Sequence, residues 1–538
     1  MSETTAWWRD AVIYQLYPRS FMDSNNDGIG DLNGIISKLD YLNDGTETSL
    51  GIDAIWLNPV YPSPQYDFGY DIINHCDIDP QYGTMEDFER LLKEAHSRGI
   101  RIIMDYVPSV TSHLNPWFLE SRSSRTNPKR DWYIWKETKG RGIYPNNWMG
   151  FFGGRAWEWD NKTQSYYYHN SLPEQPDLNW RNPEVEKAML DVVRFWFEKG
   201  VDGFRIDVLN YAYKDRYLRS NPLCIGRRPY EMQRHIHDKD LPEAYGLAGK
   251  LRAVAEEYGD RMLVAEIFSP DVDFACGFLG DDNDGVHMVF NFSFMNAGFS
   301  APRLRDEILK SENTFGLKGW PAYFLSNHDH IRHITRFEKG GFASEKAFVS
   351  AALILTLRGT PFIYMGEEIG MKEGRLKRHE IMDPPGRRYW PFFKGRDGAR
   401  TPMQWNGAEN SGFSSTKPWL RVNPDYAHLN VEFQSVNPDS LLNHYRKLIR
   451  LRKDHAALRC GSLKMLDSHP DVLAYMREGE SENLAVCLNF SNEVRTVAIK
   501  GFESRKAVRI FSYPYISAPE TSCSRITVPP YGVMIIAV

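Results

Sequence analysis

The chain has 538 residues, well above the roughly 250 residues of an ordinary β/α barrel, so a barrel in this chain would carry one or two further domains. Its 65 basic and 70 acidic residues leave a net charge of −5, which gives no electrostatic reason to bind nucleic acid or an acidic membrane surface. We therefore expect a neutral substrate.

The N-terminus lacks the basic stretch and apolar run of a secretory signal, and no apolar run is long enough to span a membrane. The six cysteines are widely scattered, without the close pairs expected of a zinc site or a small disulfide scaffold. We expect them to be free thiols in a reducing compartment. The sequence therefore predicts a cytoplasmic protein without a membrane partner.

Apolar, β-rich runs alternate with helical stretches from the N-terminus onwards, which is typical of a parallel sheet wrapped by helices. Eight such runs in this order favour a closed barrel over an open, doubly wound sheet. The sequence therefore predicts an α/β fold built on a (β/α)8 TIM barrel. The runs cover residues 11–18, 52–60, 100–108, 201–208, 261–268, 287–294, 320–329 and 359–371.

Two long stretches interrupt this alternation. One follows the third strand, is rich in Trp, Tyr, Gly and Asn, and should be a functional insertion. The other covers about residues 372–434 and should form another wall of the pocket. Near the C-terminus the pattern changes to short strands and turns. The predicted domains are a catalytic barrel of residues 1–105 and 178–460, an inserted loop-rich domain B of residues 106–177, and a C-terminal β-sandwich of residues 461–538.

Three of the strand-like runs carry an acid at or near their ends, namely Asp207, Glu266 and Asp329. Strand ends in a β/α barrel meet at one face, so acids from three strands can converge on one cup. Breaking a glycosidic bond needs such carboxylates, one to protonate the leaving oxygen and one to face the anomeric carbon. A lone acid at a strand end more often caps a helix or pairs with a base, but the joint pattern predicts an active site.

The chain strongly resembles the α-amylase superfamily, and within it the oligo-1,6-glucosidase and α-glucosidase group. The resemblance covers essentially the whole length, and the motifs occur in the family's order. It implies a glycoside hydrolase that acts on a small oligosaccharide or α-glucoside and needs no organic cofactor. The motifs are DFGYD at 67–71, QPDLNW at 175–180, GFRID at 203–207, the strand of Glu266, SNHD at 326–329 and GARTPMQW at 398–405.

This resemblance implies a role for each acid. Asp207 would be the nucleophile that forms a covalent β-glucosyl intermediate, and Glu266 the general acid and then the base, which gives retention. Asp329 would hold sugar hydroxyls and favour ring distortion. The acid needs a raised pKa, whereas Arg205, on the same strand face as Asp207, should keep the nucleophile charged.

The resemblance also implies a glucose-binding subsite. Asp67, Tyr70, His328 and Arg400 match family residues that hold the non-reducing glucose. Tyr70 would be a stacking platform, and Asp67 with Arg400 would block the far end of the pocket. Because a closed end admits only one sugar, the enzyme would be exo-acting and remove one glucose at a time.

An acidic loop near the N-terminus places oxygen ligands at alternate positions, with glycines that allow a tight turn. The spacing indicates a structural Ca²⁺ or Mg²⁺ site, since it is similar to an EF-hand loop, although the glutamate at the twelfth position is missing. The alternative is a solvated acidic turn. The predicted ligands are Asp23, Asn25, Asp27, Asp31 and the backbone carbonyl of Ile29.

The third strand departs from the family, which usually has Asn-His where this chain has Ser109 and Val110. The family's histidine bonds the C6 hydroxyl of glucose, and a buried hydroxyl without a partner costs about 1 to 3 kcal/mol. Three explanations remain open. The glycone could be altered at C6, the pocket could supply another donor, or Val110 could lower activity while leaving the fold intact.

Val208, directly after the nucleophile, matches the residue that accompanies α-1,6 cleavage in the resembling enzymes, where Ala or Thr accompanies α-1,4 cleavage. We therefore expect a retaining, exo-acting α-glucosidase that favours α-1,6 linkages and can also transfer glucose. The alternatives are a sucrose isomerase or another glucosyltransferase, an enzyme for a C6-modified glycoside, and a non-catalytic binding homologue. The sequence does not indicate the oligomeric state.

Overall fold

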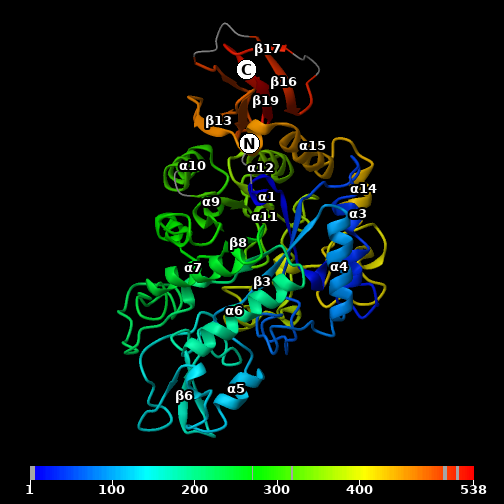
Figure 1. Cartoon of the computed structure of the whole chain (residues 1–538). Coiled ribbons are helices and arrows are strands. Elements are labelled where there is room, and N and C mark those ends of the chain that lie inside the picture. Colours follow the sequence, from blue (N-terminus) through cyan, green and yellow to red (C-terminus); the bar gives the residue numbers. More distant parts are fainter. Residues whose placement is uncertain (1–5, 270, 317–318, 501–505, 517–519) are drawn as a thin grey trace.

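Eight parallel strands form the centre of the molecule (Figure 1). The computed structural model describes residues 6–269, 271–316, 319–500, 506–516 and 520–538. The sheet order is β10-β11-β1-β2-β3-β7-β8-β9, and a parallel bridge between Phe290 and Ala322 brings the two edges together into a nearly closed barrel. The strands are β1 (Ile13–Leu16), β2 (Ala54–Leu57), β3 (Arg101–Tyr106), β7 (Gly203–Ile206), β8 (Met262–Ala265), β9 (Met288–Val289), β10 (Ala322–Phe324) and β11 (Thr360–Tyr364).

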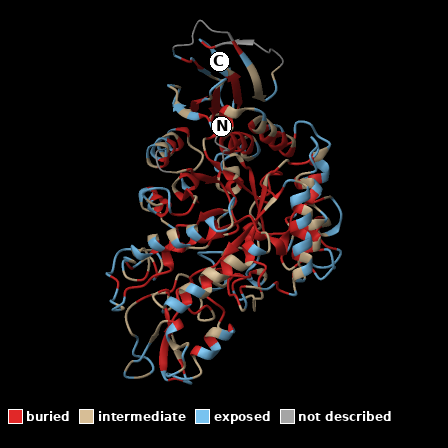
Figure 2. Ribbon diagram, in the orientation of Figure 1, coloured by how far each residue is buried: buried red, intermediate tan, exposed pale blue. Residues whose placement is uncertain are grey.

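The barrel strands are buried along almost their whole length, as Figure 2 shows in red. Parallel strands covered on both faces need continuous apolar runs, and each predicted run contains one of these strands. The run at 287–294 contributes only the two residues of β9. Its second half begins a short helix, because the Asn291 side chain accepts a hydrogen bond from the Phe294 N–H at 3.0 Å.

Helices with one polar face surround the barrel (Figure 2). Their starts follow sequence signals, such as the Thr84–Asp87 capping box of α4 and the Asn182 cap with Pro183 in the first turn of α6. Among the described residues, none of the helices is long and apolar enough to cross a bilayer. The long helices are α4 (Met85–Ser97), α6 (Pro183–Glu198), α7 (Glu243–Glu256), α10 (Ala301–Phe315), α12 (Ala343–Thr356) and α15 (Leu441–Asp454).

Shorter helices shape the connections, and several of them lie in the loops at the strand ends. They are α1 (Trp7–Asp10), α2 (Leu32–Ile36), α3 (Leu39–Leu42), α5 (Pro116–Ser121), α8 (Val272–Cys276), α9 (Phe292–Asn296), α11 (His333–Arg336), α13 (Pro384–Tyr389), α14 (Val431–Ser435) and α16 (Ala456–Arg459). The stretch at 440–458 forms two helices, α15 and α16, which are separated at His455.

The segment after β3 forms a small unit at one end of the molecule (cyan in Figure 1). Its antiparallel sheet has the order β4-β6-β5, with β4 (Trp135–Lys136), β5 (Trp157–Asp160) and β6 (Ser165–Tyr168). The sheet has a core of its own that includes Trp148 and Trp157. An antiparallel bridge between Val110 and Asp177 joins the beginning and end of the segment.

The C-terminal strands lie at the opposite end (red in Figure 1). A six-stranded sheet of order β12-β13-β14-β19-β16-β17 and the two-stranded pair β15-β18 share an apolar core, as in a sandwich. The predicted fold class is confirmed. These strands are β12 (Ser462–Met465), β13 (Val472–Glu478), β14 (Asn483–Asn489), β15 (Arg495–Val497), β16 (Lys506–Tyr513), β17 (Glu520–Ser522), β18 (Ile526–Val528) and β19 (Val533–Ala537).

Candidate active site

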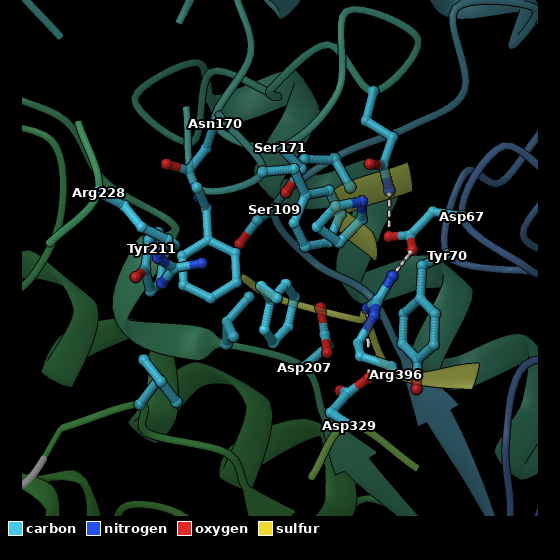
Figure 3. A pocket seen from close by; sticks show the side chains of 18 of the residues that line it. Asp67, Tyr70, Ser109, Asn170, Ser171, Asp207, Tyr211, Arg228, Asp329 and Arg396 are labelled. Atoms are coloured by element: carbon cyan, nitrogen blue, oxygen red, sulfur yellow. Dashed lines mark hydrogen bonds and ion pairs between the residues drawn. The ribbon is translucent and has the colours of Figure 1, made fainter. Parts of the chain in front are cut away.

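A cavity of about 780 Å³ opens at the carboxyl ends of the barrel strands. The three predicted acids, Asp207, Glu266 and Asp329, all line it. Figure 3 shows Asp207 and Asp329 between two sides, with Asp67, Tyr70 and Arg396 on one and Tyr211 and Arg228 on the other. The structure therefore brings together the carboxylates that the strand-end pattern singled out, in the cavity where barrel enzymes place their chemistry.

Backbone hydrogen bonds hold two of these acids directly at their strand ends. The Asp207 N–H donates to the Tyr106 carbonyl at 2.8 Å, and the Glu266 N–H donates to the Ile206 carbonyl at 2.9 Å. Val208 then adopts a left-handed conformation with φ 31°, which is unusual for a β-branched residue and carries strain of about 1 to 3 kcal/mol. Its side chain lines the cavity beside the nucleophile position.

Arg205 is the buried centre of the site. Its Nη1 donates to Asp105 at 2.6 Å and to Asp207 at 2.8 Å, and its Nη2 donates to Glu266. The guanidinium also lies over the ring of Trp56 at 5.1 Å from the centroid. One cation therefore holds three carboxylates from neighbouring strands in fixed positions.

The pKa of Glu266 agrees with what the sequence predicts, whereas the pKa of Asp207 does not. Burial raises the pKa of Glu266 to about 7, against the opposing charge of Arg205, which suits an acid that must hold a proton. Burial also raises the pKa of Asp207 above its ordinary value, and Arg205 only partly offsets this. The expectation that Arg205 keeps Asp207 charged was therefore incomplete, because it left out the cost of desolvating the carboxylate.

Asp329 has a different environment. Its carboxylate accepts hydrogen bonds from Arg400 Nη2 at 2.7 Å and Arg396 Nη1 at 3.2 Å, and His328 Nε2 lies 3.2 Å away. Burial disfavours its charge, but the polar N–H of the nearby His328 and the charges of the two guanidinium groups outweigh that effect and lower its pKa below the ordinary value. Asp329 is therefore ionised at neutral pH.

His328 and Tyr70 form a hydrogen-bonded unit on the floor of the site. The Gln15 amide donates to His328 Nδ1 at 2.8 Å, so Nε2 carries the proton and faces the Tyr70 hydroxyl at 2.8 Å. The Tyr70 hydroxyl also donates to Asp105 at 3.0 Å. Burial lowers the pKa of His328 well below its ordinary value, so the ring is neutral.

The far end of the cavity is closed by a different arginine from the one predicted. Arg396, which the sequence reasoning missed, donates from Nη2 to Asp67 and to Asp383, each at 2.7 Å. Arg400 instead pairs with Asp329 and donates from Nε to the His328 carbonyl at 2.8 Å. Asp67 therefore pairs with Arg396, whereas the predicted Arg400 holds Asp329. Both arginines belong to one short segment, and spacing alone could not tell them apart.

Two further residues of the site could have been found from the sequence. Asp105 ends β3 as the predicted acids end their strands, so the same strand-end signal applied to it. Gln175 belongs to the QPDLNW motif, lines the cavity and donates to Asp67 at 3.1 Å. A search of every strand end and motif for polar residues would have included both.

Val110 faces the cavity, and its side chain is almost fully buried. The neighbouring hydroxyl of Ser109 also lines the cavity, is buried, and has no hydrogen-bond partner. The same is true of the Asn170 side-chain oxygen on the adjoining wall (Figure 3). Hydrogen-bonding groups that could meet a substrate therefore remain next to the apolar side chain.

A buried ion pair joins two walls of the cavity. Lys214 pairs with Asp177 and donates to the Tyr211 carbonyl at 2.5 Å. The Asp177 carboxylate also accepts from the Asn170 N–H at 2.6 Å. Lys214 thereby connects the end of the inserted segment to the loop that follows the strand of Asp207.

The acidic loop at residues 23–31 has its predicted ligands in one turn, but their oxygens are already engaged. Asp23 accepts from the N–H groups of Asn25, Asn26 and Gly28 and from the Ser414 hydroxyl, which uses its four acceptor positions. Across the described ranges, no three His, Cys, Asp or Glu side chains are grouped to hold a metal. A cation would fit the oxygen chemistry of this loop only if the Ser414 hydroxyl moved away.

The chain matches two family models end to end. Residues 15–461 match the alpha amylase catalytic domain, and residues 463–535 match the maltogenic amylase C-terminal domain. It is 42% identical to a probable alpha-glucosidase of Rhizobium meliloti, over 92% of this chain and 93% of that protein. It is 41% identical to an oligo-1,6-glucosidase of Heyndrickxia coagulans, over 90% and 92% respectively.

Solved structures of similar proteins superpose over almost the whole chain. An alpha-glucosyl transfer enzyme is 38% identical with a TM-score of 0.91, and the match covers 99% of this chain and 100% of that one. An isomaltulose synthase from Erwinia rhapontici, solved as a mutant with sucrose, is 35% identical with a TM-score of 0.88 and covers 99% of both chains. Hydrolases and glucosyl-transferring enzymes therefore share this architecture.

The first prediction concerns pH. Activity on an alkyl α-glucoside, whose leaving alcohol needs a proton, should fall about tenfold per pH unit as the pH rises past about 7, because Glu266 then loses its proton. In Glu266→Gln the rate should drop about 10²- to 10⁴-fold, and this alkaline limb should disappear. A pH–rate profile of kcat/KM measures both effects.

The control is Glu373→Gln. Burial also raises the pKa of Glu373 to about 7, but this residue does not line the cavity. Its variant should keep the alkaline limb. If the limb disappeared in Glu373→Gln and survived in Glu266→Gln, the assignment of the acid would be wrong.

The second prediction concerns Arg396. Arg396→Lys should lower kcat/KM about 10- to 150-fold, because one ammonium cannot replace charge-assisted bonds to Asp67, Asp329 and Asp383, each worth about 1.5 to 3 kcal/mol. Arg387→Lys, at an exposed position nearby in the sequence, should behave as the wild type. Equal kinetics of Arg396→Lys and wild type would show that the closed end does not hold the sugar.

Proposed function

The chain belongs to the α-amylase family of glycoside hydrolases, and on that premise we propose that it is a retaining, exo-acting α-glucosidase. It would release glucose from the non-reducing end of short α-glucosides. The observation that carries the proposal is the single cavity that holds Asp207, Glu266 and Asp329 and is closed by Asp67 and Arg396. A cavity closed at one end accepts one terminal sugar.

The mechanism follows from the positions of the acids. The Asp207 carboxylate attacks the anomeric carbon while Glu266 gives its proton to the leaving oxygen, which yields a covalent β-glucosyl ester and a free alcohol. Glu266, now ionised, takes a proton from water as the water oxygen attacks the same carbon. The ester bond breaks, α-glucose leaves, and both acids return to their starting states.

Asp329 and its arginines serve the transition state. Positive charge develops on the sugar ring as the glycosidic bond breaks, and an ionised carboxylate at the ring hydroxyls stabilises it. The two guanidinium groups on Asp329 keep it charged throughout. Asp329 then favours the distorted ring over the relaxed one, which is the form of binding that accelerates a reaction.

We also propose a preference for α-1,6 linkages. Val208 lines the cavity beside Asp207, and its left-handed backbone fixes the direction of its branched side chain. Bulk at this point restricts how the second sugar approaches the anomeric carbon. A more flexible C6 linkage tolerates that restriction better than a direct ring-to-ring α-1,4 bond.

Glucosyl transfer is the second candidate function. The covalent intermediate can react with any alcohol that competes with water. Similar structures include an alpha-glucosyl transfer enzyme and a trehalulose synthase, the latter 34% identical with a TM-score of 0.89. A third candidate is a C6-modified glycone, supported by Val110 at the wall and by the unpartnered Ser109 hydroxyl.

The third prediction tests the main proposal. An NMR time course should show α-glucose as the first product from isomaltose, with slower release from maltose and sucrose. Asp207→Asn should lower these rates by about 10³-fold or more, because the covalent step is lost. First appearance of β-glucose would contradict retention, and faster turnover of maltose would contradict the linkage preference. New disaccharides from sucrose would favour the transferase alternative.

The fourth prediction concerns the C6 position. Val110→His should raise kcat/KM on glucosides about 5- to 150-fold, because a hydroxyl that lacks a partner costs about 1 to 3 kcal/mol. The same change should not help a 6-deoxyglucoside, which has no hydroxyl to bond. Parallel kinetics on the two glycosides provide the measurement. No gain on glucosides would mean that another group, such as Ser109, already serves this hydroxyl.

The fifth prediction concerns the metal. We propose that the loop at residues 23–31 binds Ca²⁺ or Mg²⁺ as a structural ion, with its oxygen ligands as the support. Chelation should then lower the melting temperature by a few degrees, and added Ca²⁺ should restore it. Asp27→Ala should remove the response, because Asp27 is an exposed ligand position. An unchanged melting temperature in the presence of chelator would show that the loop is a solvated turn without a structural ion.

A further inference from the structure

A second cavity, of about 480 Å³, adjoins the closed end of the catalytic cavity. Gln65, Tyr66 and Phe68, the neighbours of Asp67 in the chain, line it, and Phe152 lines both cavities. We call it the rear cavity. None of the three catalytic acids lines it, and its volume is in the range of small-molecule sites.

The wall of the rear cavity is largely apolar. Tyr66 is 45% exposed and Met382 is 40% exposed, so both present apolar surface to the solvent at the cavity. Exposed apolar side chains gathered around a hollow mark a place where a ligand covers them. The apolar residues of the wall are Tyr66, Phe68, Phe152, Leu172, Met382 and Pro384.

The charge of the rear cavity is positive. Its described lining residues include two arginines, Arg387 and Arg388, and no acid. Arg387 is engaged, since its Nε donates to the Ile381 carbonyl at 2.6 Å. The Arg388 guanidinium has no hydrogen bond or ion pair with any residue that the structure describes. A guanidinium without an acidic partner is a binding group for an anion such as a carboxylate.

A glycine turn of the inserted segment packs against Arg388. Gly153 and Gly154 have φ values of 96° and 86°. A Cβ on Gly153 would lie 2.9 Å from Arg388 Nε, and a Cβ on Gly154 would lie 2.8 Å from Arg388 Nη2. The guanidinium therefore rests on bare backbone, at a place where any side chain would displace it. Two separate parts of the chain, the turn and α13, thus position this cation.

We propose that the rear cavity is a second binding site, for a small aromatic carboxylate. The carboxylate accepts two charge-assisted hydrogen bonds from the fork of Arg388. Its ring is covered by the aromatic side chains of the wall, namely Tyr66, Phe68 and Phe152. This site goes beyond the proposed glucosidase function, because it uses none of the residues that carry the chemistry.

Two contacts connect the rear cavity to the closed end of the catalytic cavity. The Phe152 ring centroid lies 4.7 Å from the Arg396 guanidinium. Asp383, directly before α13, accepts from Arg396 Nη2 at 2.7 Å and Nε at 3.0 Å. Arg396 in turn holds Asp67, as the dashed line in Figure 3 shows. A ligand in the rear cavity should therefore affect sugar binding, and the sugar should affect that ligand to the same extent.

The test compares the binding of benzoate and benzamide to the whole protein by titration calorimetry. Benzamide has the same ring and a similar size but carries no charge. The wild type should bind benzoate about tenfold more tightly, because only the carboxylate forms charge-assisted bonds with Arg388. Equal affinities, or no saturable binding of benzoate, would overturn the proposal.

Two variants locate the effect at the rear cavity. Arg388→Gln, which removes the charge, and Gly154→Ala, which displaces the guanidinium, should each bring the two affinities close together. The control is Arg303→Gln on α10, which removes an exposed arginine that lines neither cavity and should keep the preference for benzoate. An unchanged preference in Arg388→Gln would overturn the proposal. Each comparison uses two ligands on one preparation, so partial loss of folded protein does not affect it.

Kinetics test the connection to the sugar site. With rising benzoate, the KM of the wild type for an alkyl α-glucoside should fall about two- to fivefold and then level off, because the ligand orders Phe152 and Arg396 before the sugar binds. A KM that stayed constant or rose to a plateau would overturn this connection. A rise without limit would place benzoate in the catalytic cavity and overturn the site. The calorimetry needs no turnover, so inactivity on every glucoside would count against the glucosidase proposal alone.

Discussion

The buried guanidinium of Arg205 is the constraint on which the site depends. Three carboxylates, Asp105, Asp207 and Glu266, converge on one buried cation at the strand ends of the barrel. Burying an ion costs several kcal/mol, and one positive charge cannot compensate three negative ones. A proton must therefore stay in the cluster, and its titration belongs to the group as a whole. A catalytic acid near neutral pH follows from this imbalance of charge.

The cavity is built as two unlike halves around that cluster. At its closed end, carboxyl groups and arginines line the wall, with Asp67, Asp329 and Asp383 bound to Arg396. At its open end, rings from separate loops form the wall. The closed end therefore offers charge and hydrogen bonds to a ligand, whereas the open end offers several aromatic rings.

Much of this arrangement could be predicted from the sequence, because its signals are local. Buried parallel strands need continuous apolar runs, so the eight strands and the acids that follow them were visible. The partner of Asp67 was not, because the choice between Arg396 and Arg400 depends on how one loop folds over the strand ends. The raised pKa of Asp207 was also hidden, since desolvation depends on everything packed around the group. The hydrogen bond from Ser414 to Asp23 joins residues far apart in the chain, and ligand spacing cannot reveal it.

The pair of Lys214 and Asp177 limits how this architecture can be recombined. The inserted segment has its own small core and looks separable, yet its last turn depends on a buried lysine from the loop after β7. A chimera that received this segment from a relative without the matching aspartate would leave the buried charge of Lys214 without its carboxylate partner beside the cavity. The inserted segment and the loop after β7 therefore depend on each other structurally. A change of specificity that replaces one of them should replace the other as well.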